Sequence, residues 1–252
     1  MQAVLYVCHG SRVKEAGRQA KLFIKQCMKA VNVSLQEICF LELEHPSIAE
    51  GFARCIERGA TKIAVVPVLL LTAIHAKQDI PNELKALQNR YPQVSISYGR
   101  PIGVHEQIPT ILLDRIGKER IKRDAIVLLV GRGSSDPDVG RDLQHIASLV
   151  ENAYPFQKVD VCYLAAAKPS FQEGLERVLS NQHNQVFIVP YLLFTGKLMM
   201  RIEQTIQQLR RRNIVLCSIL GYHPRLVDVL RQRTEEAIGG EVCVSHYDSY
   251  ER

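Results

Sequence analysis

The sequence predicts an α/β protein built from two duplicated domains, each an open parallel sheet flanked by helices, with a cleft between them. Three observations support this fold class. Short apolar, β-branched runs alternate with amphipathic segments, which is typical of parallel sheets covered on both faces. Of the 252 residues, 46% are hydrophobic and 23% charged, enough to bury a sizeable core. The third observation is that the two halves of the chain repeat each other.

A single gapless shift relates the two halves. The segment "VLYVCHGS" at 4–11 matches "VLLVGRGS" at 127–134, and "VVPVLLLT" at 65–72 matches "IVPYLLFT" at 188–195. Each match lies 123 residues further along, since residue 134 corresponds to 11 and residue 195 to 72. One shift without insertions indicates that a whole domain was duplicated.

The repeat sets the expected domains and elements. We predict an N-terminal domain that carries the site, a C-terminal repeat of the same fold and a short tail, at 1–120, 121–240 and 241–252. The apolar runs predict strands near 3–8, 36–42, 62–68, 94–98, 125–130, 158–164, 185–190 and 214–219. The amphipathic segments predict helices near 13–30, 47–58, 80–90, 104–117, 138–152, 169–180, 198–212 and 224–238. Within "QDIPNE", Pro81 fits a first helical turn and Asp79 is interpreted as its N-cap.

Composition excludes several classes of protein. The longest largely apolar run, 63–74, is shorter than the roughly 20 residues that cross a bilayer. The first residues show no secretory signal pattern. Seven cysteines without a Cys-x-x-Cys pair favour reduced thiols and a cytoplasmic location. The net charge of +6 comes from scattered basic residues, which fits an anionic small molecule and gives no indication of nucleic-acid binding.

Two histidines distinguish the first half from the second. His9 follows the first strand and corresponds to Arg132, and His75 follows the third strand and corresponds to Leu198. A single histidine after a strand is more often a packing or capping residue. Both strands, however, end at the same edge of a parallel sheet, where ligands of open α/β folds bind. We therefore expect the two imidazoles to lie together.

Two carboxylates also distinguish the first half from the second at this edge of the sheet. Glu42 and Glu44 lie at the end of the second strand, and the second half has Ala165 and Ala167 instead. The alternating pattern "FLELEH" could also describe one exposed strand face, but a parallel sheet normally has no solvated face. The coincidence of these substitutions with those of the histidines favours one site, confined to the first half.

The chemistry of this residue set leaves alternatives open. Two neutral imidazoles and a carboxylate bind divalent ions such as Fe²⁺, Co²⁺, Ni²⁺ or Zn²⁺ and leave coordination positions free. A metal-bound water would make a hydrolase. A two-lobed metal carrier without turnover would use the same ligands.

Three motifs resemble the class II chelatases, in particular the long, two-domain sirohydrochlorin ferrochelatase and cobaltochelatase type. These motifs are "VCHGSR", "FLELEHPSI" and "VVPVLLLTAIHAKQDIP", and the resemblance covers residues 1 to about 240. It implies insertion of a divalent metal into a tetrapyrrole without an organic cofactor. It also implies that His9, His75 and Glu42 are the catalytic, metal-binding residues, and that a histidine accepts pyrrole protons.

The resemblance further implies a substrate and its partners. The substrate would be sirohydrochlorin, a polycarboxylate, receiving Fe²⁺ in siroheme biosynthesis, with cobalt insertion for cobalamin or stoichiometric metal or tetrapyrrole binding as alternatives. Candidate substrate-binding residues are Gly10, Ser11, Arg12, Lys77, Arg132 and Ser134. Some short relatives are half-length homodimers, so the duplicated chain resembles a fused version with one site kept, and a monomer is expected. Asp79 is favoured as an N-cap over a second role, in which it would orient His75.

Overall fold

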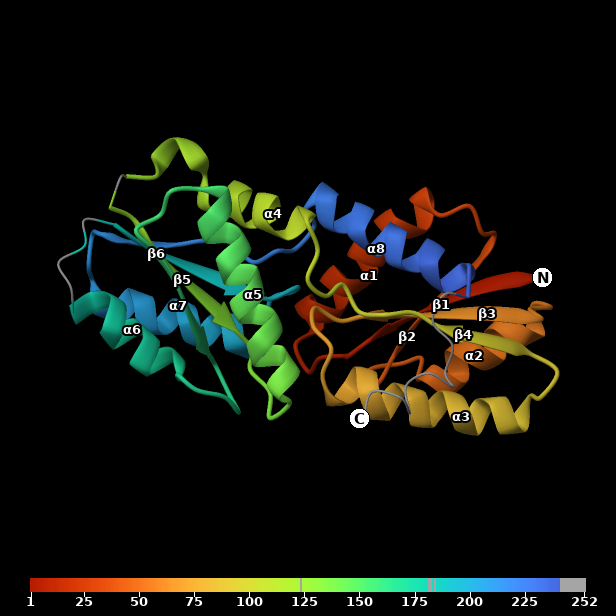
Figure 1. Ribbon diagram of the computed structural model, residues 1–252. Coiled ribbons are helices and arrows are strands. Elements are labelled where there is room, and N and C mark those ends of the chain that lie inside the picture. The colour runs from red at the N-terminus through yellow and green to blue at the C-terminus, as the bar shows by residue number, and fades with distance from the viewer. Residues whose placement is uncertain (123, 181–182, 184, 241–252) are drawn as a thin grey trace. The chain divides into compact units, whose positions relative to one another are not determined.

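The computed structural model describes residues 1–122, 124–180, 183 and 185–240, so the predicted tail at 241–252 lies outside the described residues. It contains two four-stranded sheets, ordered β2-β1-β3-β4 and β6-β5-β7-β8, in which every paired strand is parallel (Figure 1). The predicted fold class, two parallel sheets flanked by helices, is confirmed. The cleft expected between them stays a prediction.

The elements follow the sequence pattern closely. The first sheet is formed by β1 (Gln2–Cys8), β2 (Leu35–Phe40), β3 (Lys62–Val68) and β4 (Ser95–Tyr98), and the second by β5 (Ile126–Gly131), β6 (Lys158–Tyr163), β7 (Val186–Tyr191) and β8 (Ile214–Leu216). The α-helices are α1 (Lys14–Ala30), α2 (Ile48–Glu57), α3 (Ile80–Arg90), α4 (Gln107–Ile116), α5 (Pro137–Ala153), α6 (Phe171–Ser180), α7 (Lys197–Leu209) and α8 (Pro224–Ile238). A π-helical turn, His75–Asp79, precedes α3, and a 3₁₀ turn, Lys118–Arg120, follows α4.

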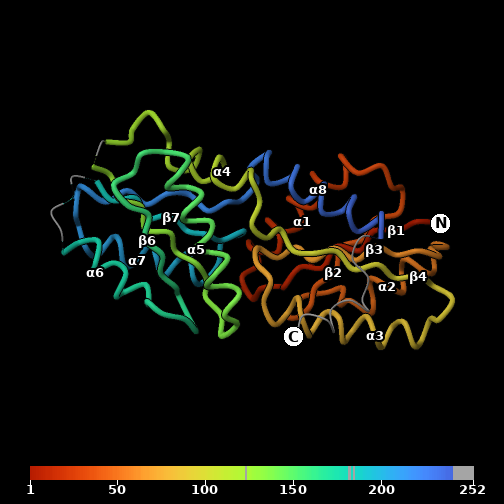
Figure 2. The backbone as a smooth tube through the Cα atoms, in the orientation of Figure 1, coloured from red at the N-terminus to blue at the C-terminus, as the bar shows by residue number. Residues whose placement is uncertain are grey.

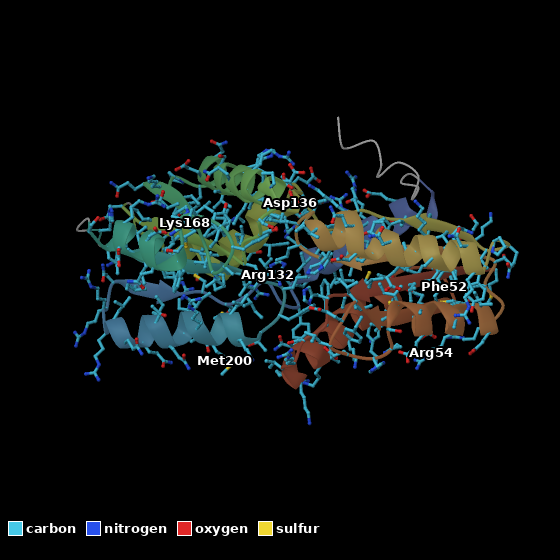
Figure 3. The ribbon with its side chains drawn as sticks, turned by 90° about the horizontal axis from the view of Figure 1, so that it is seen from below. Phe52, Arg54, Arg132, Asp136, Lys168 and Met200 are labelled. Atoms are coloured by element: carbon cyan, nitrogen blue, oxygen red, sulfur yellow. The ribbon has the colours of Figure 1, made fainter. Side chains whose placement is uncertain are left out.

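Alternate residues of the central strand β1 face opposite layers of helices. Ala3, Leu5 and Val7 are fully buried in one apolar cluster with residues of α2 and α3. Phe52 and Arg54 show the two faces of α2, because Phe52 is fully buried and Arg54 is exposed (Figure 3). Sheets buried on both faces explain the nearly continuous apolar strands of the sequence.

The compact units do not coincide with the sequence repeats. One unit combines residues 1–103 with 227–240, and the other spans Val104–Leu226 (Figure 2). The chain thus leaves the first unit after Gly103 and returns to it at Val227, so that α4 belongs to the second unit and most of α8 to the first. The limits 1–120 and 121–240 describe the repeat. In the packed structure, however, the last helix of each repeat belongs to the unit built mainly from the other repeat. Because α4 and α8 occupy equivalent places in the two repeats, hydrophobic periodicity could not predict which unit each helix joins.

Side-chain contacts hold α8 on the first unit. Ser97 Oγ donates to the carbonyl oxygen of Ala237 at 2.6 Å. The buried guanidinium of Arg233 donates to the carbonyl oxygen of Ile102 at 2.9 Å and pairs with Glu236, which also pairs with Arg100.

Within the described residues, no helix has the length and apolar character needed to span a membrane.

Candidate active site

A backbone contact sets the loop after β1 against the loop after β2. The N–H of Glu42 donates to the carbonyl oxygen of His9 at 3.1 Å, continuing the parallel ladder beyond Phe40, where β2 ends. Gly10, at φ +94°, makes this approach possible, because a Cβ there would lie 1.8 Å from the carbonyl oxygen of Glu42. Glu42, expected as the last residue of a strand, is therefore placed in the adjoining loop, beside His9.

The π-helical turn after β3 carries His75 to the same edge. Ile80 donates its N–H to the carbonyl oxygen of His75, the i to i+5 bond of a π-turn, and the chain continues directly into α3. The hydroxyl of Tyr98, at the end of β4, donates to the carbonyl oxygen of the buried Ala76 at 2.9 Å. The end of the sheet thus fixes the turn that presents His75.

The two predicted histidines form a close pair. Their Nε2 atoms lie 3.1 Å apart, and the ring planes are nearly perpendicular, at 83°. Glu42 Oε1 lies 3.5 Å from His9 Nε2. The side chains of His9 and His75 are 24% and 30% exposed, and that of Glu42 is 49% exposed, so the group is open to solvent on one side. The structure therefore brings together the three side chains that the sequence suggested.

Hydrogen bonds fix the tautomers of the pair. His9 Nδ1 lies 3.1 Å from the carbonyl oxygen of Gly10, and His75 Nδ1 lies 2.6 Å from Asp79 Oδ2. Because both oxygens only accept, each Nδ1 carries a hydrogen, and the two Nε2 atoms that face one another are the positions left for a cation. Only a shared cation, a proton or a metal ion, makes such a contact favourable.

The spacing suits a divalent ion. Two imidazole nitrogens bound at roughly 2.0–2.1 Å to one ion are about 3 Å apart, close to the separation of the two Nε2 atoms here. As the side chains lie, no group of three His, Cys, Asp or Glu residues in the described part of the chain forms a complete ligand set. The preformed part of the site is the histidine pair, with Glu42 Oε1 3.5 Å from His9 Nε2.

Asp79 is not an N-cap, and the prediction that it caps α3 is wrong. Its backbone is helical, at φ −65°, and its side chain makes no capping bond. Because the π-turn runs straight into α3, no helix N-terminus is left at Asp79 for a cap to satisfy. Its carboxylate instead accepts the Nδ1–H of His75. The shift of 123 pairs Asp79 with Ile202, a further polar-to-apolar difference that the sequence contained and that would have identified it.

Glu44 supports the loop rather than the histidines. Its Oε1 accepts the N–H of Ser11 at 3.0 Å, and its Oε2 lies 3.6 Å from Lys21 Nζ. Ser11 Oγ in turn accepts the N–H of Val13 at 3.1 Å. The N–H and the hydroxyl oxygen of Ser11, a predicted substrate-binding residue, thus already have partners within the loop.

The other predicted substrate-binding residues fall into two groups. Arg12 is exposed after the His9 loop, and Lys77 is half-buried on the π-turn, both in the unit that contains the histidines. Arg132 and Ser134 lie in the loop after β5 of the second unit. Arg132 is exposed (Figure 3). Ser134 Oγ accepts the N–H of Asp136.

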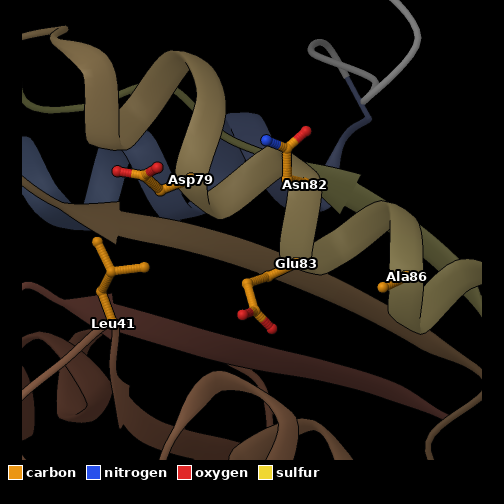
Figure 4. Close-up of a pocket in the computed structure, with 5 residues that line it drawn as sticks. All are labelled: Leu41, Asp79, Asn82, Glu83 and Ala86. Atoms are coloured by element: carbon orange, nitrogen blue, oxygen red, sulfur yellow. The ribbon is translucent and has the colours of Figure 1, made fainter.

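An open pocket of about 340 Å³ adjoins Asp79. Asp79, Asn82, Glu83 and Ala86 line it along the turn and α3, with Leu41 opposite them (Figure 4). Asp79 therefore contacts a ligand candidate, His75, and also lines an accessible hollow.

The CbiX family model matches the chain twice, over residues 3–119 and 126–237. The chain belongs to the CbiX family. The double match follows the internal repeat and confirms the resemblance to chelatases.

Among the relatives of this chain, a sirohydrochlorin ferrochelatase of Priestia megaterium is 50% identical, and the match covers 99% of this chain and 95% of the relative. A sirohydrochlorin cobaltochelatase of the same organism is 38% identical, and the match covers 96% of this chain and 82% of the relative. The solved structure of SirB from Bacillus subtilis with Fe³⁺ is 45% identical in sequence, with a TM-score of 0.88, and the match covers 95% of this chain and 96% of the SirB chain.

Proposed function

We propose that this chain is a sirohydrochlorin ferrochelatase, which inserts Fe²⁺ into sirohydrochlorin in siroheme biosynthesis. The observation that carries the proposal is the pair of facing Nε2 atoms, 3.1 Å apart, beside Glu42. The identity of 50% with a sirohydrochlorin ferrochelatase over nearly the whole chain supports the same reaction.

Each residue has a role in this reaction. His9 and His75 hold the incoming ion through Nε2, and Glu42 supplies a carboxylate ligand. As the ion enters the ring, two pyrrole N–H protons must leave; an imidazole released from the metal accepts one of them, and solvent water accepts the other. No organic cofactor is needed, since neither oxidation nor group transfer takes place.

The substrate's carboxylates call for basic partners. Arg12 and Lys77 flank the histidines in sequence, and Gly10 and Ser11 form the loop between His9 and Arg12. Arg132 and Ser134 stand at the equivalent loop of the second repeat and are proposed to bind further carboxylates. The reaction takes place in the cytoplasm, on a monomer.

One site per chain follows from the second repeat. Where the first has His9, Glu42 and His75, the second has an arginine, an alanine and a leucine, none of which can hold the ion in the same way.

Cobalt is the alternative metal. The identity of 38% with a sirohydrochlorin cobaltochelatase favours it as a second candidate, and histidine with carboxylate ligands accepts Co²⁺ as readily as Fe²⁺. In that case the product would serve cobalamin synthesis.

Anaerobic incubation of the protein with sirohydrochlorin and either Fe²⁺ or Co²⁺, followed by absorbance, tests the proposal. We expect catalytic turnover, and His9→Ala and His75→Ala should each abolish it. His145→Ala is the control, because His145 is exposed on α5 in the second unit. Normal turnover in both active-site variants, or stoichiometric binding without turnover, would refute the assignment.

A further inference from the structure

We propose that Asp79 is a positioning residue that orients His75 and holds it in the Nδ1–H tautomer, so that Nε2 is free for the metal. This inference rests on the proposed function, because it assigns His75 as a metal ligand. Asp79 acts through His75 and does not itself contact the ion.

The geometry of the pair supports this role. Asp79 Oδ2 lies 2.6 Å from His75 Nδ1, a short distance typical of a bond to a charged acceptor. Residues four apart stack one turn above the other on a helix, and the π-turn keeps both within one anchored segment. The hydroxyl of Tyr98 holds this segment at the carbonyl oxygen of Ala76, next to His75.

The pair contributes little to the fold. The Asp79 side chain is 44% exposed, and even a fully charged pair at such an exposed place adds little stability. In the second repeat the same two places hold Leu198 and the fully buried Ile202, which pack together in an apolar cluster. The scaffold can therefore be built with apolar residues there, and the polar pair occurs in the half that carries the other ligand candidates.

A metal-binding histidine benefits from a carboxylate partner such as Asp79 in two ways. A carboxylate that accepts the far ring N–H fixes the tautomer of a ligating histidine and makes its other nitrogen a better donor. Loss of such a partner lowers metal affinity or activity about 10- to 100-fold in proteins.

Titration of the full-length protein with Co²⁺ alone, followed by absorbance and calorimetry, tests the proposal without sirohydrochlorin. Asp79→Ala should raise the Co²⁺ dissociation constant about 10- to 100-fold. Asp79→Glu, which restores a carboxylate, should recover part of the loss. Glu83→Gln is the matched control, since Glu83 lies one turn further along α3 and lines the same pocket. It should change the constant less than about 2-fold, within the scatter of exposed surface substitutions.

A spectroscopic readout separates positioning from a general structural effect. In nitrogen-detected NMR of the histidine side chains, the wild-type His75 should show Nδ1–H, and Asp79→Ala should show mixed tautomers. An unchanged Co²⁺ constant and tautomer in Asp79→Ala would overturn the proposal. If Asp79→Ala weakens Co²⁺ binding while the wild type fails to metallate sirohydrochlorin, the positioning role stands and the proposed function fails.

Discussion

Glu42 and His9 meet twice, once through the backbone and once through their side chains. The N–H of Glu42 donates to the carbonyl oxygen of His9 at 3.1 Å, and Glu42 Oε1 lies 3.5 Å from His9 Nε2. In the second unit, the N–H of Ala165 donates in the same way to the carbonyl oxygen of Arg132 at 2.9 Å. The backbone contact belongs to the scaffold, and the ligand candidates have been added to one copy of it.

Gly10→Ala and Gly133→Ala should separate scaffold from site. A Cβ would lie 1.8 Å from the carbonyl oxygen of Glu42 at Gly10 and 1.9 Å from that of Ala165 at Gly133. Both variants should lose stability, on the order of 1–3 kcal/mol, because each residue has a positive φ as well as this contact. Urea unfolding measures that loss. Co²⁺ affinity in the absence of sirohydrochlorin should fall only in Gly10→Ala, and an equal fall in folded Gly133→Ala would contradict the assignment of the metal site to the first unit.

Gly17→Ala and Gly140→Ala should differ in effect although both lie at equivalent places in helices. At Gly17 a Cβ would lie 2.3 Å from Glu44 Oε2, which must then move and release the N–H of Ser11. At Gly140 the nearest atom is the Tyr163 hydroxyl at 3.6 Å, an ordinary contact. Gly140→Ala should gain about 0.5–1 kcal/mol from helix propensity. Gly17→Ala should gain less and lose activity, as measured by unfolding and by metal insertion. Unchanged activity in Gly17→Ala would show that Glu44 is not needed to hold the loop.

Glu236 should make the docking of α8 sensitive to acid. Burial by itself would raise its pKa, but hydrogen bonds and charges from Arg100 and Arg233 outweigh burial and lower the pKa below its usual range. A carboxyl group whose pKa is lowered in the folded state stabilises the protein at pH values above its pKa in the unfolded chain, about 4.3. This stabilisation is lost as the pH falls through the lower pKa of the folded state. Glu236→Gln should flatten the decline of the urea midpoint below about pH 5. Arg100→Gln should flatten it in part, and a wild-type slope in Glu236→Gln would contradict the prediction.

Two exposed apolar side chains should contribute to binding the tetrapyrrole. Leu43 is 50% exposed and follows Glu42 in sequence, and Ile74 is 40% exposed and precedes His75. The second repeat has Ala166 and Lys197 at these positions. Leu43→Ala with Ile74→Ala should raise the KM for sirohydrochlorin several-fold, because contact with the apolar ring face is lost. The Co²⁺ constant and the thermal midpoint should not change. A KM equal to that of the wild type would exclude both side chains from the binding surface.

The sequence predicted the parts of the site that depend on sheet topology. His9, Glu42 and His75 could be placed at one sheet edge because parallel strands end on the same side and the internal repeat marked these positions as different. Asp79 was misassigned because Asp two residues before Pro has the pattern of an N-cap. The π-turn places the Asp79 side chain against His75. This turn is held by the hydrogen bond from Tyr98 to Ala76, 22 residues apart in the chain, which a local sequence pattern does not reveal. The exchange of α4 and α8 escaped prediction because the two repeats offer equivalent places for a terminal helix.

The exchanged helix gives the protein an unusual order of assembly during synthesis. Residues 104–226 form the second unit without interruption, whereas the first unit needs the segment from Val227 onwards. At about 5–20 residues per second, a ribosome takes roughly 6–25 s to make the intervening stretch. The half of the chain that carries His9 and His75 is thus translated first but completed last. A nascent chain without its C-terminal helix has both histidines and an unfinished domain to hold them.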